Sequence, residues 1–134
     1  MADWTLHPKL LNDTALLGDL PLSRVLVMND ANYPWLILVP REPEITDLAE
    51  TEQAQLMAEI ARVARALKAV TACDKLNIAA LGNVVPQLHV HVIARRRGDA
   101  AWPRPVWGAA QAIAYNKAAL ETFIGAIRSE IGIG

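Results

Sequence analysis

The sequence predicts an α+β domain built on a mainly antiparallel sheet of about five strands, with one long helix and a C-terminal helix. Short apolar runs bounded by turn-forming residues occur in the first third of the chain and again between residues 75 and 95, as is typical of strands. Elsewhere apolar residues recur at the three- and four-residue spacing of amphipathic helices. No strand-like run leads through a glycine-rich loop into a helix, which argues against a dinucleotide fold or a P-loop.

Three strands are expected before residue 41. Residues 14–20 are weakly strand-like, with a turn signal at Gly18-Asp19. Residues 24–28 are a stronger candidate and end at the turn-forming sequence Asn29-Asp30-Ala31-Asn32. The continuous apolar run at 35–39, followed by Pro40, predicts a buried strand.

The long helix is expected from Asp47 or Thr51 to about Ala69. Its apolar face follows a 4, 3, 4, 3 spacing through Leu56, Ile60, Val63, Leu67 and Val70. Asp47, with Glu50 three residues later, has the pattern of an N-terminal cap. Two further strands are expected at 75–81 and 87–95, and a final helix at about 116–131.

Composition predicts a single domain over residues 1–134, in the cytoplasm. The 134 residues suit one domain, and no apolar run approaches the ~20 residues that span a bilayer. The N-terminus lacks the basic start and apolar run of a signal peptide, and the lone Cys73 has no partner for an internal disulfide. With 13 basic and 14 acidic residues the chain has no charge excess for nucleic-acid binding, so neither a nucleic-acid nor a membrane partner is expected.

Two of the three histidines, His89 and His91, lie two residues apart in the last predicted strand. Side chains alternate along a strand, so Gln87, His89 and His91 are expected on one face and the intervening aliphatic residues on the other. Spacing alone leaves three interpretations open: an ordinary polar strand face, the floor of a reactive site, or a His-x-His metal site. The metal site would need a third ligand, such as Asp30 or Asp99, from elsewhere in the chain.

Residues 77–95 closely resemble the histidine-triad (HIT) superfamily, whose signature is His-φ-His-φ-His-φ-φ with φ apolar. Residues 35–41 also resemble that family's apolar strand followed by Pro and Lys/Arg, and the long helix comes next as in the family. The resemblance covers most of residues 23–97 and implies a HIT-like fold. It describes a variant, because Gln87 stands where the first motif histidine is expected.

The resemblance assigns roles by position. His89 matches the nucleophile and His91 the histidine that contacts the reacting phosphate, so these two are the candidate catalytic residues. Four side chains become candidate substrate-binding residues: Gln87, Asn83 in the phosphate loop, Asn77 on the preceding strand and Asp30 toward the ribose. Trp35 replaces a histidine often found at the start of the third strand, and Val84 lacks the usual hydroxyl of the loop.

These roles imply attack by His89 on the α-phosphorus of a nucleotide conjugate, giving a nucleotidyl-phosphohistidine that water then hydrolyses. The conjugate is either a dinucleoside polyphosphate or a nucleoside phosphoramidate. The scheme needs no metal or other cofactor, and the resemblance also implies a homodimer. Two alternatives remain: a nucleotide-binding protein with little or no turnover, and the metal site.

Three other features have two interpretations each. The basic run Arg95-Arg96-Arg97 is either a solvated strand end or an attraction for phosphates. Trp102 and Trp107 either pack at an edge of the domain or stack near the nucleotide base. His7 is expected to be a surface or packing residue.

Overall fold

Five strands form one antiparallel sheet in the computed structural model, which describes residues 3–133. The order across the sheet is β1-β2-β3-β5-β4, and every neighbouring pair is antiparallel. The strands are β1 (Thr14–Asp19), β2 (Ser23–Met28), β3 (Trp35–Pro40), β4 (Lys75–Ala79) and β5 (Val90–Arg95). The predicted α+β class and antiparallel sheet are therefore confirmed.

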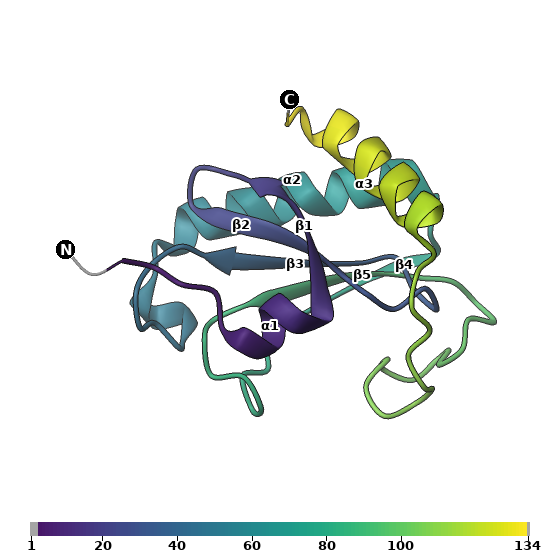
Figure 1. The fold of residues 1–134 in the computed structure, drawn as a ribbon, viewed down its shortest axis with the longest axis horizontal. Helices are drawn as coiled ribbons and strands as arrows, with labels where there is room; N and C mark the ends of the chain where they lie inside the picture. Colours follow the sequence, from purple (N-terminus) through teal and green to yellow (C-terminus); the bar gives the residue numbers. More distant parts are fainter. Residues whose placement is uncertain (1–2, 134) are drawn as a thin grey trace.

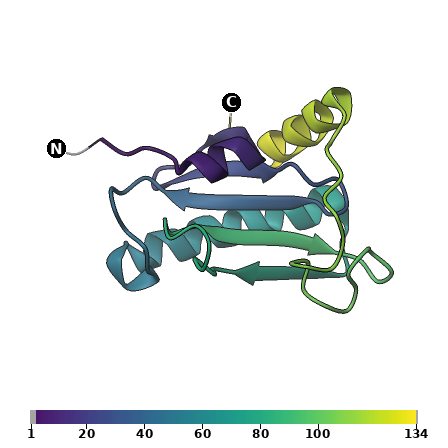
Figure 2. The same ribbon diagram turned by 60° about the horizontal axis from the view of Figure 1, so that its bottom comes forward.

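The helices lie on both sides of this sheet. The long helix α2 (Gln53–Thr71) and the C-terminal helix α3 (Lys117–Ile131) share one face, where they contact each other, and α2 also contacts β5. The short helix α1 (Pro8–Asp13) lies in front of the other face, next to β1 (Figure 2). A 3₁₀ turn, η1 (Leu48–Glu50), precedes α2.

Two apolar clusters fill the two faces of the sheet. The larger one joins inward side chains of the strands, such as Val25, Leu36 and Val92, to the predicted stripe of α2 and to Ile127 and Ile131 of α3. The smaller one lies on the opposite face and includes Leu10 of α1. Because both faces are covered at the centre, every residue of β3 and β5 is buried.

The last strand is shorter than the sequence predicts, and this changes the expected geometry of its first residues. β5 begins at Val90, whereas 87–95 was expected to be extended. Residues 87–89 lie outside the strand, and the Leu88 N–H donates to the carbonyl of Ile45 at 3.0 Å instead of to a neighbouring strand. Gln87 is therefore not in strand register with His89 and His91.

Three further differences are local. Helix α1 was not predicted, since six residues are too few for a clear apolar period. Asp47 and Glu50 do form a cap, but for η1: Glu50 Oε1 accepts from the Asp47 N–H at 2.9 Å, and α2 starts later. Gly18 lies within β1 next to a bulge, and a Cβ there would come within 3.1 Å of Arg128 and Ile133.

Candidate active site

His89 lies just before β5, with only 6% of its surface exposed. Its Nδ1 is 2.7 Å from the backbone carbonyl oxygen of Gln87. A carbonyl oxygen can only accept, so Nδ1 carries the hydrogen and the neutral ring has its lone pair on Nε2. A bare Nε2 is the form of imidazole that can attack phosphorus.

His91 is the second residue of β5 and is 4% exposed. Its ring centre is 4.9 Å from that of His89, and its Nδ1 accepts a hydrogen bond from the indole Nε1 of Trp35 at 3.0 Å. Burial, and then the neighbouring His89, lower the pKa of His91 to about 4. The ring is therefore neutral at physiological pH.

The two histidines share a hollow of about 300 Å³ on the face of the sheet that α1 partly covers, here called the histidine hollow. Its wall includes the loop at Gly82, Asn83 and Val84, together with Lys9 and Asp13 of α1. Gly82 has a φ of +72°, a conformation that favours glycine. Asn83 thus lines the histidine hollow, and Val84 brings no hydroxyl to the same wall.

Asp30 lies in an adjoining hollow of about 420 Å³ that shares Asp13, Met28 and Trp35 with the histidine hollow. Its Oδ1 accepts from the N–H groups of Asn32 at 3.0 Å and Ile113 at 3.3 Å. Asp30 is buried, with 6% of its surface exposed, and these two bonds hold its carboxylate in place. The two hollows together have the volume of a small-molecule site.

Gln87 does not lie beside the histidines as the alternation of a strand implied. Its Oε1 accepts from the His7 N–H at 2.8 Å and its Nε2 donates to the Thr5 carbonyl at 2.9 Å. Both ends of the amide are therefore bonded to the N-terminal segment. Gln87 contributes to the site through its backbone carbonyl, the partner of His89, and the expectation that its amide contacts substrate is not supported.

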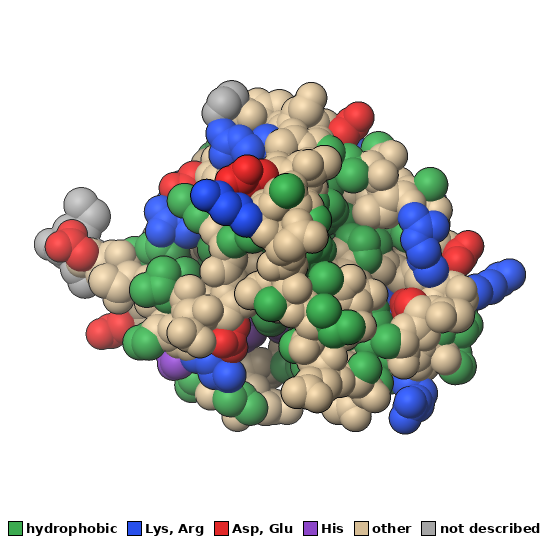
Figure 3. All heavy atoms as spheres, turned by 45° about the vertical axis from the view of Figure 1, so that its right-hand side comes forward, with side chains coloured by type: hydrophobic (Ala, Val, Ile, Leu, Met, Phe, Trp, Pro, Cys, Tyr) green, Lys and Arg blue, Asp and Glu red, His purple; other side chains and the backbone are tan. Residues whose placement is uncertain are grey.

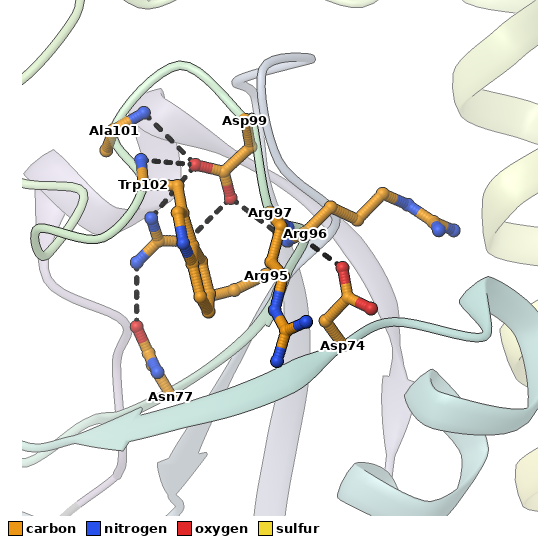
Figure 4. Close-up of polar contacts among 8 residues, drawn as sticks. All are labelled: Asp74, Asn77, Arg95, Arg96, Arg97, Asp99, Ala101 and Trp102. Atoms are coloured by element: carbon orange, nitrogen blue, oxygen red, sulfur yellow. Dashed lines mark hydrogen bonds and ion pairs between the residues drawn. The ribbon is translucent and has the colours of Figure 1, made fainter.

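Asn77 is also bonded away from the histidines (Figure 4). It is paired with Ile93 in the sheet, and its Oδ1 accepts from Arg95 Nη1 at 2.8 Å. Arg95, the first residue of the basic run, is 1% exposed and forms an ion pair with Asp99 at 2.8 Å. Its guanidinium is therefore neither solvated nor available to attract a phosphate. Arg96 and Arg97 are exposed.

The loop after β5 brings the two tryptophans to different places. Trp102 lies against the guanidinium of Arg95, 5.6 Å from ring centre to Cζ, which fits the packing interpretation. Trp107 lines the histidine hollow, and its ring centre lies 5.0 Å from that of His91. His7 caps α1, where its Nδ1 accepts from the Lys9 N–H.

The surroundings do not favour a metal. Among residues 3–133, no three His, Cys, Asp or Glu side chains are grouped so that they could hold an ion. Of the two carboxylates considered as third ligands, Asp99 is bonded to Arg95 and Asp30 to two backbone amides.

On the face seen in Figure 3, positive and negative side chains are interspersed. Within residues 3–133, no helix is both long and apolar enough to cross a bilayer.

Sequence reasoning missed several side chains of the histidine hollow, among them Lys9, Asp13 and Trp35. Lys9 and Asp13 come from the unpredicted α1, and Trp35 was noted only as a departure from a histidine. The feature that could have indicated a site role for Trp35 is its position at the start of β3, the strand that pairs with β5 and its His91. Trp35 lies opposite Ile93 and one pleat from the partner of His91.

The fold and site define a class of protein: an antiparallel sheet that presents two differently bonded imidazoles in one hollow. Residues 9–98 match the HIT domain family, and the chain belongs to this family. A histidine triad protein of Bradyrhizobium japonicum has a similar structure, with 61% identity and a TM-score of 0.95 over 97% of this chain and 99% of its own. A HIT protein of Sinorhizobium meliloti has 45% identity and a TM-score of 0.93, over 95% and 96% of the two chains.

A more distant similarity links part of the chain to a longer protein. An AP-4-A phosphorylase of Mycobacterium tuberculosis is 36% identical over a match that covers 51% of this chain. The same match covers 41% of the phosphorylase, so this chain spans well under half of that relative.

Proposed function

We propose that this protein is a nucleotide hydrolase or nucleotidyl transferase that acts at the α-phosphate of a nucleotide conjugate through His89. The observation that carries the proposal is the bond from His89 Nδ1 to the Gln87 carbonyl, which leaves Nε2 free as a nucleophile. The His89 ring is buried in the floor of the histidine hollow, beside the neutral imidazole of His91.

In the proposed reaction, the lone pair of His89 Nε2 forms a bond to the α-phosphorus. The bond from phosphorus to the leaving group breaks, and its electron pair departs with the leaving group. An oxygen of water, or of inorganic phosphate in a transfer reaction, then attacks the same phosphorus. The bond from phosphorus to Nε2 breaks and its electron pair returns to Nε2, which restores the free imidazole, and the proton of an attacking water is released to solvent. His91 donates a hydrogen bond to a phosphoryl oxygen as negative charge develops there, the kind of contact whose loss costs about 10²–10³ in rate.

The nucleoside is proposed to occupy the adjoining hollow, with Asp30 accepting hydrogen bonds from the ribose hydroxyls. Oδ1 of Asp30 is already bonded to two amides, while Oδ2 has no hydrogen-bond partner in the described part of the chain. Asn83 is proposed to contact the phosphate from the loop. Asn77, held by Arg95, is proposed to support the site from the sheet rather than bind substrate.

The substrate is either a dinucleoside polyphosphate or a nucleoside phosphoramidate. The AP-4-A phosphorylase relative favours the polyphosphate class. His89 also lines a second hollow of about 330 Å³ with Asp47 and Leu81, which leaves room near the reacting group for the rest of a conjugate.

Replacement of His89 by alanine tests the proposal. We expect turnover of AP-4-A or an adenosine phosphoramidate to fall by about 10³-fold or more, while AMP binding measured by calorimetry is retained. Mass spectrometry of acid-sensitive intermediates should find a nucleotidyl group on His89 of the wild type. His7→Asn is the matched control, because it removes a histidine but keeps the helix-capping acceptor, and it should retain activity.

Wild-type activity in His89→Ala would disprove the mechanism. AMP binding without turnover in the wild type would instead identify a nucleotide-binding protein. Loss of activity in EDTA with recovery in zinc would identify a metal enzyme.

A further inference from the structure

The hydrogen bond between Trp35 and His91 determines where the proton of His91 lies. The indole nitrogen is a donor only, so the imidazole Nδ1 that receives its hydrogen cannot carry one of its own. The distance between the two nitrogens is 3.0 Å, an ordinary hydrogen-bond length. In the neutral ring, the hydrogen of His91 is consequently on Nε2.

Trp35 is itself held firmly. It is the first residue of β3, is 6% exposed, and is opposite Ile93 in the ladder to β5. Its ring makes edge contacts with Tyr33, at 6.3 Å between centres, and with Trp107, at 5.7 Å. An indole fixed on both sides has little freedom to turn its N–H away from His91.

We propose that Trp35 is a positioning residue that fixes His91 as a neutral Nε2–H donor, so that the two histidines of the site have opposite tautomers. The Gln87 carbonyl imposes the other tautomer on His89, with its hydrogen on Nδ1. One ring thus presents a lone pair and its neighbour presents a hydrogen. The part that these opposite tautomers play in catalysis rests on the function proposed above. The assignment of the tautomers rests on the hydrogen bonds alone.

A tryptophan imposes this arrangement more strictly than a histidine would. An imidazole at position 35 could either donate to or accept from His91, so both tautomers of His91 would be accessible. Protonation of His91 would put a second N–H opposite the indole N–H and break the bond. The other charged or titratable groups of the histidine hollow are His89 and the pair Lys9–Asp13, whose Nζ and Oδ2 are 3.0 Å apart.

The tautomer is measured directly in ¹⁵N-labelled protein, from the two-bond correlations of ring protons to ring nitrogens. In the wild type we expect the hydrogen of His91 on Nε2 and that of His89 on Nδ1 at neutral pH. A wild-type His91 with its hydrogen on Nδ1 would overturn the proposal without any variant.

Trp35→Phe keeps an aromatic ring but removes the donor. We expect the midpoint of His91 titration to rise by about one pH unit, the equivalent of one net hydrogen bond. Trp107→Phe is the matched control, because it alters a ring at 5.0 Å from His91 that makes no hydrogen bond to it. The control should leave the midpoint and the tautomer of His91 in place. Equal shifts in both variants would show that Trp35 acts by packing alone.

Turnover gives a separate readout. We expect Trp35→Phe to lower kcat by about tenfold with a smaller change in KM, since the misplaced hydrogen bond matters most in the transition state. If the tautomers are as proposed but the wild type has no activity, the proposed function fails and the positioning role stands. If the protein is active and Trp35→Phe changes neither the titration nor kcat, the positioning role fails alone.

Discussion

The imidazole of His91 has almost no contact with solvent, and its environment opposes a positive charge. Burial is the larger cause, and the neighbouring His89 the smaller, of a pKa lowered to about 4. In the unfolded chain the same group titrates near about 6.5. The unfolded state therefore takes up a proton at a higher pH than the folded state does.

Stability is consequently expected to depend on pH through this one residue. The contribution of neutral His91 is complete above the unfolded pKa, and it is lost as the pH falls from about 6.5 toward about 4. Between pH 7.5 and pH 4.5 we expect the free energy of unfolding to decrease by about 2–3 kcal/mol. Urea unfolding at a series of pH values, followed by circular dichroism, measures the decrease.

The control for this pH effect is His91→Asn, which keeps an acceptor for the Trp35 indole but removes the titrating group. The variant should show a much flatter dependence over the same window. The carboxylates whose pKa is lowered, such as Asp99 and Asp19, lose their contributions only at lower pH. An unchanged slope in His91→Asn would assign the effect to other groups.

At the scale of elements, the loop after β5 is anchored by one buried ion pair. Arg95 is 1% exposed and its guanidinium is bonded to Asp99 and Asn77 (Figure 4). The Asp99 carboxylate also accepts from the N–H groups of Ala101 and Trp102. Arg95, as the main cause, and these amides hold the pKa of Asp99 well below its usual value. The loop then continues to Trp107 in the histidine hollow.

Asp99→Ala is therefore expected to be costly. It leaves the buried Arg95 charge without its partner, which typically destabilises by about 3–5 kcal/mol. Asp74→Ala is the comparison, because within residues 3–133 the exposed Asp74 side chain accepts only from the Arg97 N–H. This substitution should cost about 1 kcal/mol or less. Denaturant unfolding of both variants measures the two losses in the free energy of unfolding. Similar losses in the two would mean that the loop is held mainly by its apolar contacts.

The elements that the sequence predicts well are those whose pattern is local. The period of α2, the apolar run of β3 and the helix predicted at about 116–131 all follow from neighbouring residues. The true start of β5 does not, since it depends on the bond from Leu88 to Ile45, which lies 43 positions earlier.

The same distinction applies to the candidate site. His89 and His91 were found because they lie two residues apart in the sequence and match a family motif. The bonding of Gln87 to Thr5 and His7, and of Trp35 to His91, joins residues more than 50 positions apart. Sequence spacing on a single strand carries no information about such partners.

At the scale of the whole molecule, the two edges of the sheet are unequal. The β1 edge is next to α1 and α3, which both contact that strand. The β4 edge pairs with β5 on one side only among the described residues, and Ile78 on this strand is 51% exposed. An edge strand with free N–H and C=O groups and an exposed apolar side chain is suited to pairing with another copy.

We therefore expect a homodimer in which two β4 strands meet across a two-fold axis and the two sheets become continuous, as the family resemblance also implied. Multi-angle light scattering should give about twice the 14.6 kDa chain mass. Ile78→Lys should shift the mass toward that of the monomer, because it places a charge in the centre of the contact. Leu16→Lys, at a 59% exposed position on the opposite edge strand, should remain dimeric. A wild type that stays monomeric at high concentration would exclude the dimer. If Leu16→Lys alone dissociates it, the contact lies at the β1 edge instead.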